Sequence, residues 1–236
     1  SYWTTSDEEC RQIPSSDREF ELGRVLEQEL KELGLEKVVL TDHCYVYGLL
    51  SATPGYENKP SIGFIAHMDT VSDYCDHDII PVVHKNYDGG DLPLGTSGRT
   101  LTIKDFPHLP SLAGRTLITT DGTTVLGADD KAGVAEIMTM AEALIKENIP
   151  HGPISIAFTP DEEVGGGTDH FNVEKFAAQF AYTLDGDTEG EIQYENFNAC
   201  KADFEITGFA VHPGSSKDTM INACLVAAEI NNMLPG

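Results

Sequence analysis

Basic residues are scarce in this chain of 236 residues. It holds 15 Lys and Arg against 39 Asp and Glu, which gives a formal net charge of -24. Binding to nucleic acid or to an anionic membrane depends on Lys and Arg that neutralise phosphate groups. We therefore expect neither partner. Most of the acidity is typical of a soluble surface, and a smaller share could serve metal ions or a positively charged substrate.

Cysteine motifs, long apolar segments and an export signal are also missing. The five cysteines are odd in number and widely scattered, and none forms a Cys-x-x-Cys pair. This pattern argues against a disulfide framework and against a cysteine zinc site. No apolar run approaches the roughly 18 residues of a membrane span, and the start, SYWTTSDEECR, has no basic region followed by an apolar stretch. We expect a cytoplasmic protein.

The order of predicted elements indicates an α/β fold. In chain order we expect a helix over 17–33, strands over 37–40, 44–52 and 61–66, a strand over 116–120, a helix over 130–147, a strand over 154–158, a helix near 172–180 and a strand over 181–185. Strands that alternate with helices are typical of a mostly parallel sheet with helices on both faces. Residues 84–115 lack sustained periodicity, which favours a functional loop.

Histidine or acidic residues lie at the ends of four strands of the predicted sheet. They are His67 and Asp69 after 61–66, Asp129 and Asp130 after 116–120, Asp161, Glu162 and Glu163 after 154–158, and Asp185 at the end of 181–185. A single Asp after a strand is commonly a helix cap or a turn residue. In an α/β sheet, however, ligands bind beyond the carboxyl ends of the strands. Carboxylates crowded there raise one another's pKa unless a cation compensates, so the sequence predicts a metal site.

The residue types indicate which metals the site would hold. Oxygen ligands with imidazole and without thiolate favour zinc, manganese or cobalt in an open catalytic site. Residues two apart on a strand share a face, so Asp69 can hydrogen-bond one ring nitrogen of His67 while the other binds metal. Glu162 and Glu163 leave an extended backbone on opposite sides. We interpret one of them as a metal ligand and the other as a base that acts on water.

Six short motifs then occur in a fixed order along the chain. They are HMDT, LGADDKAG, FTPDEEVGGG, AYTLDGDTEGEI, NFNA and HPGSSK. Their order and spacing resemble the peptidase T family, the cytoplasmic tripeptide aminopeptidases of the co-catalytic zinc peptidase clan that also holds carboxypeptidase G2 and aminoacylase-like enzymes. The resemblance runs essentially from end to end, and six ordered motifs are far more specific than a lone His-x-Asp.

The resemblance implies two metal ions in a complete site, zinc with manganese or cobalt as possible substitutes. His67 and Asp185 would be ligands of the first metal, and Glu163 a ligand of the second. Asp129 would bridge the two ions. The family also implies a cis peptide bond between Asp129 and Asp130.

Three further roles follow from the same resemblance. Glu162 would be the general base, Asp69 would orient the histidine ligand, and His212 would donate a hydrogen bond to the tetrahedral oxyanion. The implied reaction is hydrolysis of the peptide bond after the first residue of a tripeptide. Glu162 would move a proton from water to the leaving amine.

The resemblance also predicts how the chain is organised. We expect a catalytic domain over 1–198 and the start of a smaller α+β lid domain over 199–236, through which a homodimer could form. Family members are longer, and the last histidine ligand of their second metal would lie beyond Gly236. The chain alone is therefore expected to bind the second metal weakly and to be inactive or nearly so.

Three other functions stay open on the sequence alone. The same site could hydrolyse an N-acyl amino acid, a dipeptide or a C-terminal residue. Two-metal phosphoester hydrolysis fits the ligands, but few Lys or Arg are available to bind phosphate. A non-catalytic metal-binding or interaction protein is possible because acidic clusters also bind calcium, although Glu162 beside His67 and Asp129 argues for catalysis.

Overall fold

The computed structural model describes residues 2–186, 188–196, 198–200 and 202–234. The chain divides into two compact units, Ser1–Glu191 and Ile192–Gly236. This division falls a few residues before the boundary expected at 198, and the roles expected of the two parts remain predictions. In the part of the chain that is described, no helix is both long and apolar enough to cross a membrane.

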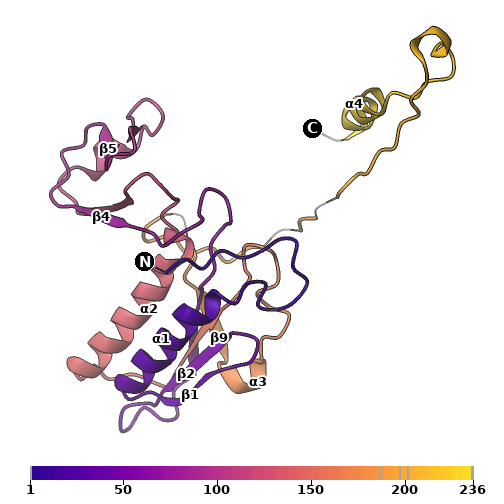
Figure 1. The fold of residues 1–236 in the computed structure, drawn as a ribbon. Helices are drawn as coiled ribbons and strands as arrows, with labels where there is room; N and C mark the ends of the chain where they lie inside the picture. The colour runs from indigo at the N-terminus through magenta and orange to yellow at the C-terminus, as the bar shows by residue number, and fades with distance from the viewer. Residues whose placement is uncertain (1, 187, 197, 201, 235–236) are drawn as a thin grey trace. The chain divides into compact units, whose positions relative to one another are not determined.

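A five-stranded sheet forms the centre of the larger unit (Figure 1). Its strands, in spatial order, are β1 (Glu36–Leu40), β2 (Val46–Leu50), β8 (Ile154–Thr159), β3 (Ile62–His67) and β9 (Phe180–Thr183). β3 runs parallel to both β8 and β9, whereas β2 runs antiparallel to both β1 and β8. The expected α/β fold is confirmed. The sheet is less parallel than expected because the β1–β2 hairpin joins it through β2.

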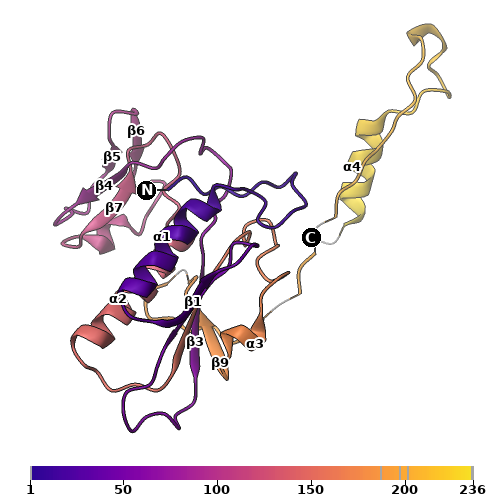
Figure 2. The ribbon, with the colours of Figure 1, turned by 60° about the horizontal axis from the view of Figure 1, so that its bottom comes forward.

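Two long helices lie side by side on one face of the sheet, α1 (Glu19–Glu32) and α2 (Ala128–Lys146) (Figures 1 and 2). Leu26 and Leu30 of α1 recur at helical spacing, and with Ile137 of α2 they belong to the buried cluster over β2, β3 and β8. Burying each such side chain stabilises the fold by about 1.5–3 kcal/mol. This core holds β3 and β8 in place, and site residues lie at or just after the carboxyl ends of these two strands.

The opposite face is covered by α3 (Val173–Phe176), which is much shorter than the helix expected near 172–180. Asn172 begins it by accepting a hydrogen bond from the main-chain N of Lys175 at 2.7 Å. Ala177 ends it with a left-handed φ of 54°. Phe176 belongs to a buried cluster with Tyr47 of β2 and Ala157 of β8, so helices do flank both faces.

One strand that the sequence assigned to the central sheet lies outside it. β7 (Leu117–Thr120) pairs antiparallel with β4 (Pro81–His84) in a separate two-stranded sheet (Figure 2). The expectation that 116–120 belongs to the main sheet is therefore wrong, because the main chain of β7 pairs with β4 instead. Residues 84–115 are also more structured than expected: they include β5 (Leu92–Leu94) paired with β6 (Arg99–Leu101) and the 3₁₀ turn η1 (Leu109–Leu112).

The described residues of the smaller unit form a 3₁₀ turn η2 (Pro213–Ser215) and the helix α4 (Ala223–Met233). Asn222 begins α4 by accepting a hydrogen bond from the main-chain N of Cys224 at 3.0 Å. An isolated bridge joins Phe209 to Ile221 just before this helix.

Candidate metal centre

His67 is the last residue of β3, and its buried imidazole faces carboxylates from three other segments. Its Nε2 atom lies 2.8 Å from Oδ1 of Asp129, 3.8 Å from Oε2 of Glu162 and 3.9 Å from Oδ2 of Asp185. These acids come from the start of α2, the turn after β8 and the segment after β9. The fold therefore brings together residues that are far apart in the sequence.

The other ring nitrogen of His67 is held by Asp69. Nδ1 lies 3.0 Å from the main-chain oxygen of Asp69 and 3.2 Å from its carboxylate Oδ1. Both groups are acceptors, so Nδ1 carries a hydrogen and Nε2 is directed to the carboxylates. Burial lowers the pKa of His67, but hydrogen bonds to Asp69 and Asp129 outweigh it and raise the pKa to about 10.

Three side chains could hold a metal ion together. His67, Asp129 and Asp185 each offer one ligand atom, and these atoms lie within 4.8 Å of one another. Burial first, and then the charge of Asp129, raise the pKa of Asp185, so repulsion between the two carboxylates adds to the effect of burial. A divalent cation relieves that repulsion, and one nitrogen with two carboxylate oxygens suits zinc. The residues present therefore fit a metal ion.

Glu162 and Glu163 follow β8 in a tight turn whose main chain is fixed. Oδ1 of Asp69 accepts a hydrogen bond from the N atom of Glu162 at 2.9 Å, and Oδ2 accepts one from the N atom of Glu163 at 3.1 Å. The side chain of Glu162 stays 52% exposed while it approaches His67. Burial raises the pKa of both acids, with further increases from Asp185 at Glu162 and from Asp129 at Glu163.

The peptide bond between Asp129 and Asp130 is cis, as the resemblance implies. Asp130 is buried, and its carboxylate accepts hydrogen bonds from the N atoms of His67 at 3.2 Å and Gly133 at 3.0 Å. Burial and then the charge of Asp185 raise the pKa of Asp130 to about 7. Asp130 thus holds the main chain of His67, a function that sequence reasoning missed. Its place next to Asp129 is the one signal that pointed to it.

Asp161, at the start of the turn after β8, forms an acidic pair with Glu19 that the sequence did not reveal. Asp161 is fully buried, and its carboxylate accepts hydrogen bonds from the N atom of Ser15 at 2.7 Å and from the Ser15 hydroxyl. The N atom of Asp161 donates to Oε2 of Glu19 at 3.2 Å. More than 140 residues separate these partners, so no local pattern could indicate them.

His212 belongs to the smaller unit and is exposed. It precedes η2, and its Nδ1 atom accepts a hydrogen bond from the N atom of Gly214 at 3.1 Å. This contact keeps the ring within its own loop. The role of His212 as an oxyanion donor stays a prediction.

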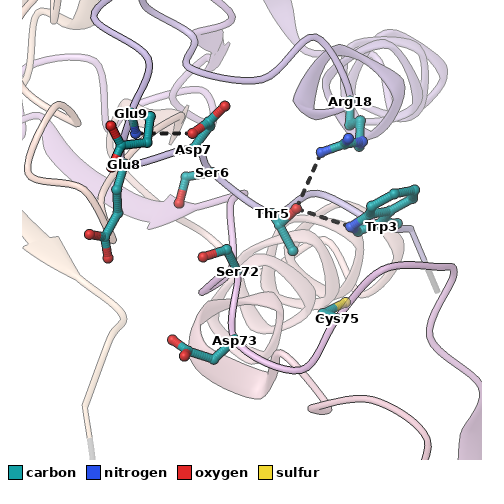
Figure 3. A pocket seen from close by; sticks show the side chains of 10 residues that line it. All are labelled: Trp3, Thr5, Ser6, Asp7, Glu8, Glu9, Arg18, Ser72, Asp73 and Cys75. Carbon is teal, nitrogen blue, oxygen red and sulfur yellow. Dashed lines mark hydrogen bonds between the residues drawn. The ribbon is translucent and has the colours of Figure 1, made fainter.

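A separate pocket of about 510 Å³ lies beside the N-terminal segment (Figure 3). Its lining residues are Trp3, Thr5, Ser6, Asp7, Glu8, Glu9, Arg18, Ser72, Asp73 and Cys75. The guanidinium of Arg18 lies 3.9 Å from the ring centre of Trp3, and both side chains donate hydrogen bonds to the Thr5 hydroxyl. None of the predicted site residues lines this pocket, so the candidate metal centre is a distinct feature.

A family model described as Peptidase family M20/M25/M40 matches residues 125–229, the segment that carries Asp129, the two glutamates and Asp185. The chain is also 54% identical over 233 residues to a Peptidase T of Clostridium perfringens. The chain is thus similar to peptidase family M20/M25/M40 over residues 125–229 and to Peptidase T over nearly all of its length. That alignment covers 98% of this chain and 57% of the relative, so the chain spans little more than half the length of the relative.

Solved structures support the fold of this chain. Aminopeptidase PepT of Bacillus cereus matches it with a TM-score of 0.56 at 23% identity, and a tripeptidase of Staphylococcus aureus matches with a TM-score of 0.60 at 20% identity. Each match covers 98% of this chain and 53% of the solved chain. At these identities the matches show that the α/β architecture is shared.

Proposed function

We propose that this chain supplies the metal centre of an aminopeptidase that removes the first residue of tripeptides. The observation that carries the proposal is the convergence of His67, Asp129 and Asp185 on one point, with Glu162 beside them. The Peptidase T name of the relative supports the reaction and the substrate. Both apply to the whole protein that contains the chain.

The proposed ligands divide between two metal ions. His67 and Asp185 would hold the first ion, Glu163 would contribute to the second, and Asp129 would bridge them. Zinc suits these donors best, and manganese or cobalt could replace it. When bound, such a pair of ions polarises the scissile carbonyl and makes a water molecule more acidic.

Glu162 is the proposed general base. Its half-exposed carboxylate can reach solvent, and its raised pKa strengthens it as a proton acceptor near neutral pH. It would take a proton from water and pass it to the leaving amine. Asp69 supports this step, because its carboxylate holds both the ring of His67 and the N atom of Glu162.

Further parts of the proposal concern the surroundings of the site. We propose that the substrate is a short peptide with a free amino end, and the net charge of -24 suits a substrate that carries a positive amine. His212 is the proposed donor to the oxyanion. We also propose a cytoplasmic enzyme that forms a homodimer through residues 199–236.

A substrate panel combined with metal analysis tests the proposal. The zinc-loaded protein that carries this chain is given a free tripeptide, its N-acetylated form and a matched dipeptide. Hydrolysis of the free tripeptide alone is expected. Preference for the acetylated form would indicate an N-acyl amidohydrolase, and preference for the dipeptide would indicate a dipeptidase.

Two substitutions should then fail in different ways. Glu162→Gln should keep its metal and lose about 10²–10⁴-fold in rate, the usual contribution of a general base. Glu163→Ala should lose metal. Glu174→Gln, an exposed acid of α3, is the control and should behave as the parent protein. Full activity of Glu162→Gln would refute the assigned base.

A further inference from the structure

Three consecutive main-chain N atoms of the turn after β8 donate to buried carboxyl groups. The N atom of Asp161 donates to Glu19 at 3.2 Å, and those of Glu162 and Glu163 donate to Asp69 at 2.9 and 3.1 Å. Asp69 follows β3, whereas Glu19 begins α1. The segment that carries both functional glutamates is thus held from two sides of the fold.

The burial of the Glu19 carboxyl has a cost in folding free energy. Its exposed fraction is 0%, and its Oε1 atom has no hydrogen-bond partner within the described part of the chain. A buried carboxyl with an unpaired oxygen destabilises a fold. Leu22, Leu26 and Leu30 already provide the apolar packing of α1. Among the described residues, the Glu19 side chain forms its hydrogen bonds with Asp161. The polar group of Glu19 therefore stabilises the turn and not the helix in which Glu19 lies.

Asp161 itself needs such support. Its φ of 53° lies in the left-handed region, which residues other than glycine adopt uncommonly. Its carboxylate is held by Ser15, and its main-chain oxygen accepts a hydrogen bond from the N atom of Gly166 at 2.8 Å. Glu19 holds the remaining polar group, the N atom. The conformation of Asp161 is therefore fixed at all three of these groups.

We infer that Glu19 is a positioning residue for Glu162 and Glu163: its hydrogen bond to the N atom of Asp161 fixes the turn from which both acids project. The inference rests on the proposed function, in which these two acids are base and ligand. Glu19 acts through the main-chain N atom of Asp161.

The chemistry of Glu19 predicts which replacements preserve this action. Burial, and then the charges of Asp161 and Asp69, raise the pKa of Glu19 to about 10, so the carboxyl is protonated at neutral pH. A protonated carboxyl can accept from the N atom of Asp161 and donate toward its carboxylate. Glutamine has the same shape and the same two abilities, whereas leucine has neither.

The test compares three variants of the 236-residue chain. They are Glu19→Leu, Glu19→Gln and, as a control on the same helix, Glu21→Leu, which changes an exposed acid. Two quantities are measured: the hydrogen–deuterium exchange of residues 159–167 without metal, and the affinity for Co²⁺ with its visible absorption spectrum.

Glu19→Leu should increase exchange in residues 159–167 by about fivefold relative to the rest of the chain, which corresponds to the loss of one hydrogen bond. It should weaken Co²⁺ binding by a similar factor and change the cobalt spectrum. Glu19→Gln and Glu21→Leu should match the parent chain in both measurements.

Two results would overturn the inference. One is a folded Glu19→Leu chain in which exchange rises evenly, or not at all, and Co²⁺ affinity is unchanged. The other is a loss in Glu19→Gln as large as in Glu19→Leu. If Glu19→Leu does not fold, Ser15→Ala replaces it, because this change removes a hydroxyl contact to Asp161 and, besides it, only the hydrogen bond that the hydroxyl accepts from the N atom of Asp7 at 2.8 Å. Unchanged exchange at 159–167 in Ser15→Ala would count equally against the inference.

The two readouts separate this inference from the proposed function. The exchange measurement needs no metal, so it tests the turn by itself. A parent chain that binds no Co²⁺, or binds it as well after His67→Ala, would refute the proposed metal centre while the exchange data still decide the role of Glu19.

Discussion

Asp69 and Glu162 are 93 residues apart in the chain, yet Oδ1 of Asp69 accepts a hydrogen bond from the N atom of Glu162 at 2.9 Å. The resemblance gives Asp69 one function, the orientation of His67. The structure adds a second, because the same carboxylate holds the main chain of the glutamate pair. One buried side chain thereby couples the histidine at the end of β3 to the turn after β8.

The first prediction concerns Asp69→Asn. The asparagine oxygen can accept from one N–H group of the turn, whereas its NH₂ group would face the other donor. We expect a loss of about 1–3 kcal/mol in the free energy of unfolding, the usual cost of an unsatisfied buried group. Denaturant unfolding measures it, and Asp42→Asn, at an exposed position, should change stability little. Equal stability of the two variants would contradict the assigned contacts.

The second prediction concerns metal addition. A ligand that binds only the folded chain stabilises it, by about 2.7 kcal/mol at a concentration 100 times its Kd. Zinc should therefore raise the unfolding temperature of the parent chain, and a chelator should reverse the change. His67→Ala and Asp185→Asn should abolish the effect, whereas His108→Ala, at an exposed position, should preserve it. Full stabilisation of His67→Ala would place the metal elsewhere.

The third prediction concerns pH. Glu19 keeps its proton in the folded chain up to a pKa of about 10, whereas in the unfolded chain its pKa returns to the usual 4.5. Between these values the folded state binds more protons. The contribution of Glu19 to stability is therefore complete below the lower pKa and is lost as the pH rises through the upper one. The slope is at most about 1.4 kcal/mol per pH unit.

Glu19→Gln isolates this effect, because glutamine does not titrate. The free energy of unfolding of the parent chain should fall relative to that of Glu19→Gln as the pH rises from about 5 to about 9. A difference that stays constant over this range would show that Glu19 is ionised in the folded chain at neutral pH.

The fourth prediction concerns Gly133. A Cβ atom at this position would overlap the carbonyl oxygen of Leu184 and lie 2.5 Å from Oδ1 of Asp130. Gly133→Ala should cost about 1–3 kcal/mol in unfolding free energy, as overpacking does. It should also weaken metal binding, because Asp130 holds the main chain of His67. Gly186→Ala meets no atom within 4 Å and is the matched control.

Local patterns in the sequence predicted most of the elements of the larger unit. Leucines at helical spacing indicated α1, and short apolar segments indicated β2, β3 and β8, because these signals depend on residues close together in the chain. The prediction of the sheet to which β7 belongs failed for the opposite reason: the sequence pattern of a strand does not indicate which strand it pairs with. The preference of β7 for β4 depends on contacts that only the folded chain reveals.

The candidate site divides in the same way. The position of His67, Asp129 and Asp185 at element ends could be read from the sequence, and the structure brings them together. The residues whose hydrogen bonds fix these three side chains and their main chain could not be predicted from the sequence. Thr4 is an example: its hydroxyl donates to the main-chain oxygen of Met68 at 2.7 Å, yet the N-terminal segment has no periodicity that would place it beside β3. Supporting contacts of this kind join distant residues of ordinary type.

The three tethered N–H groups of residues 161–163 also limit how this site can be altered. A turn held in this way cannot slide to compensate for a shorter acid, so Glu162→Asp would leave its carboxylate one methylene short of its present reach. Variation in such a site must come from the length and chemistry of the side chains. For protein engineering, the main chain of the turn is therefore fixed, and only the side chains at positions 162 and 163 can be varied.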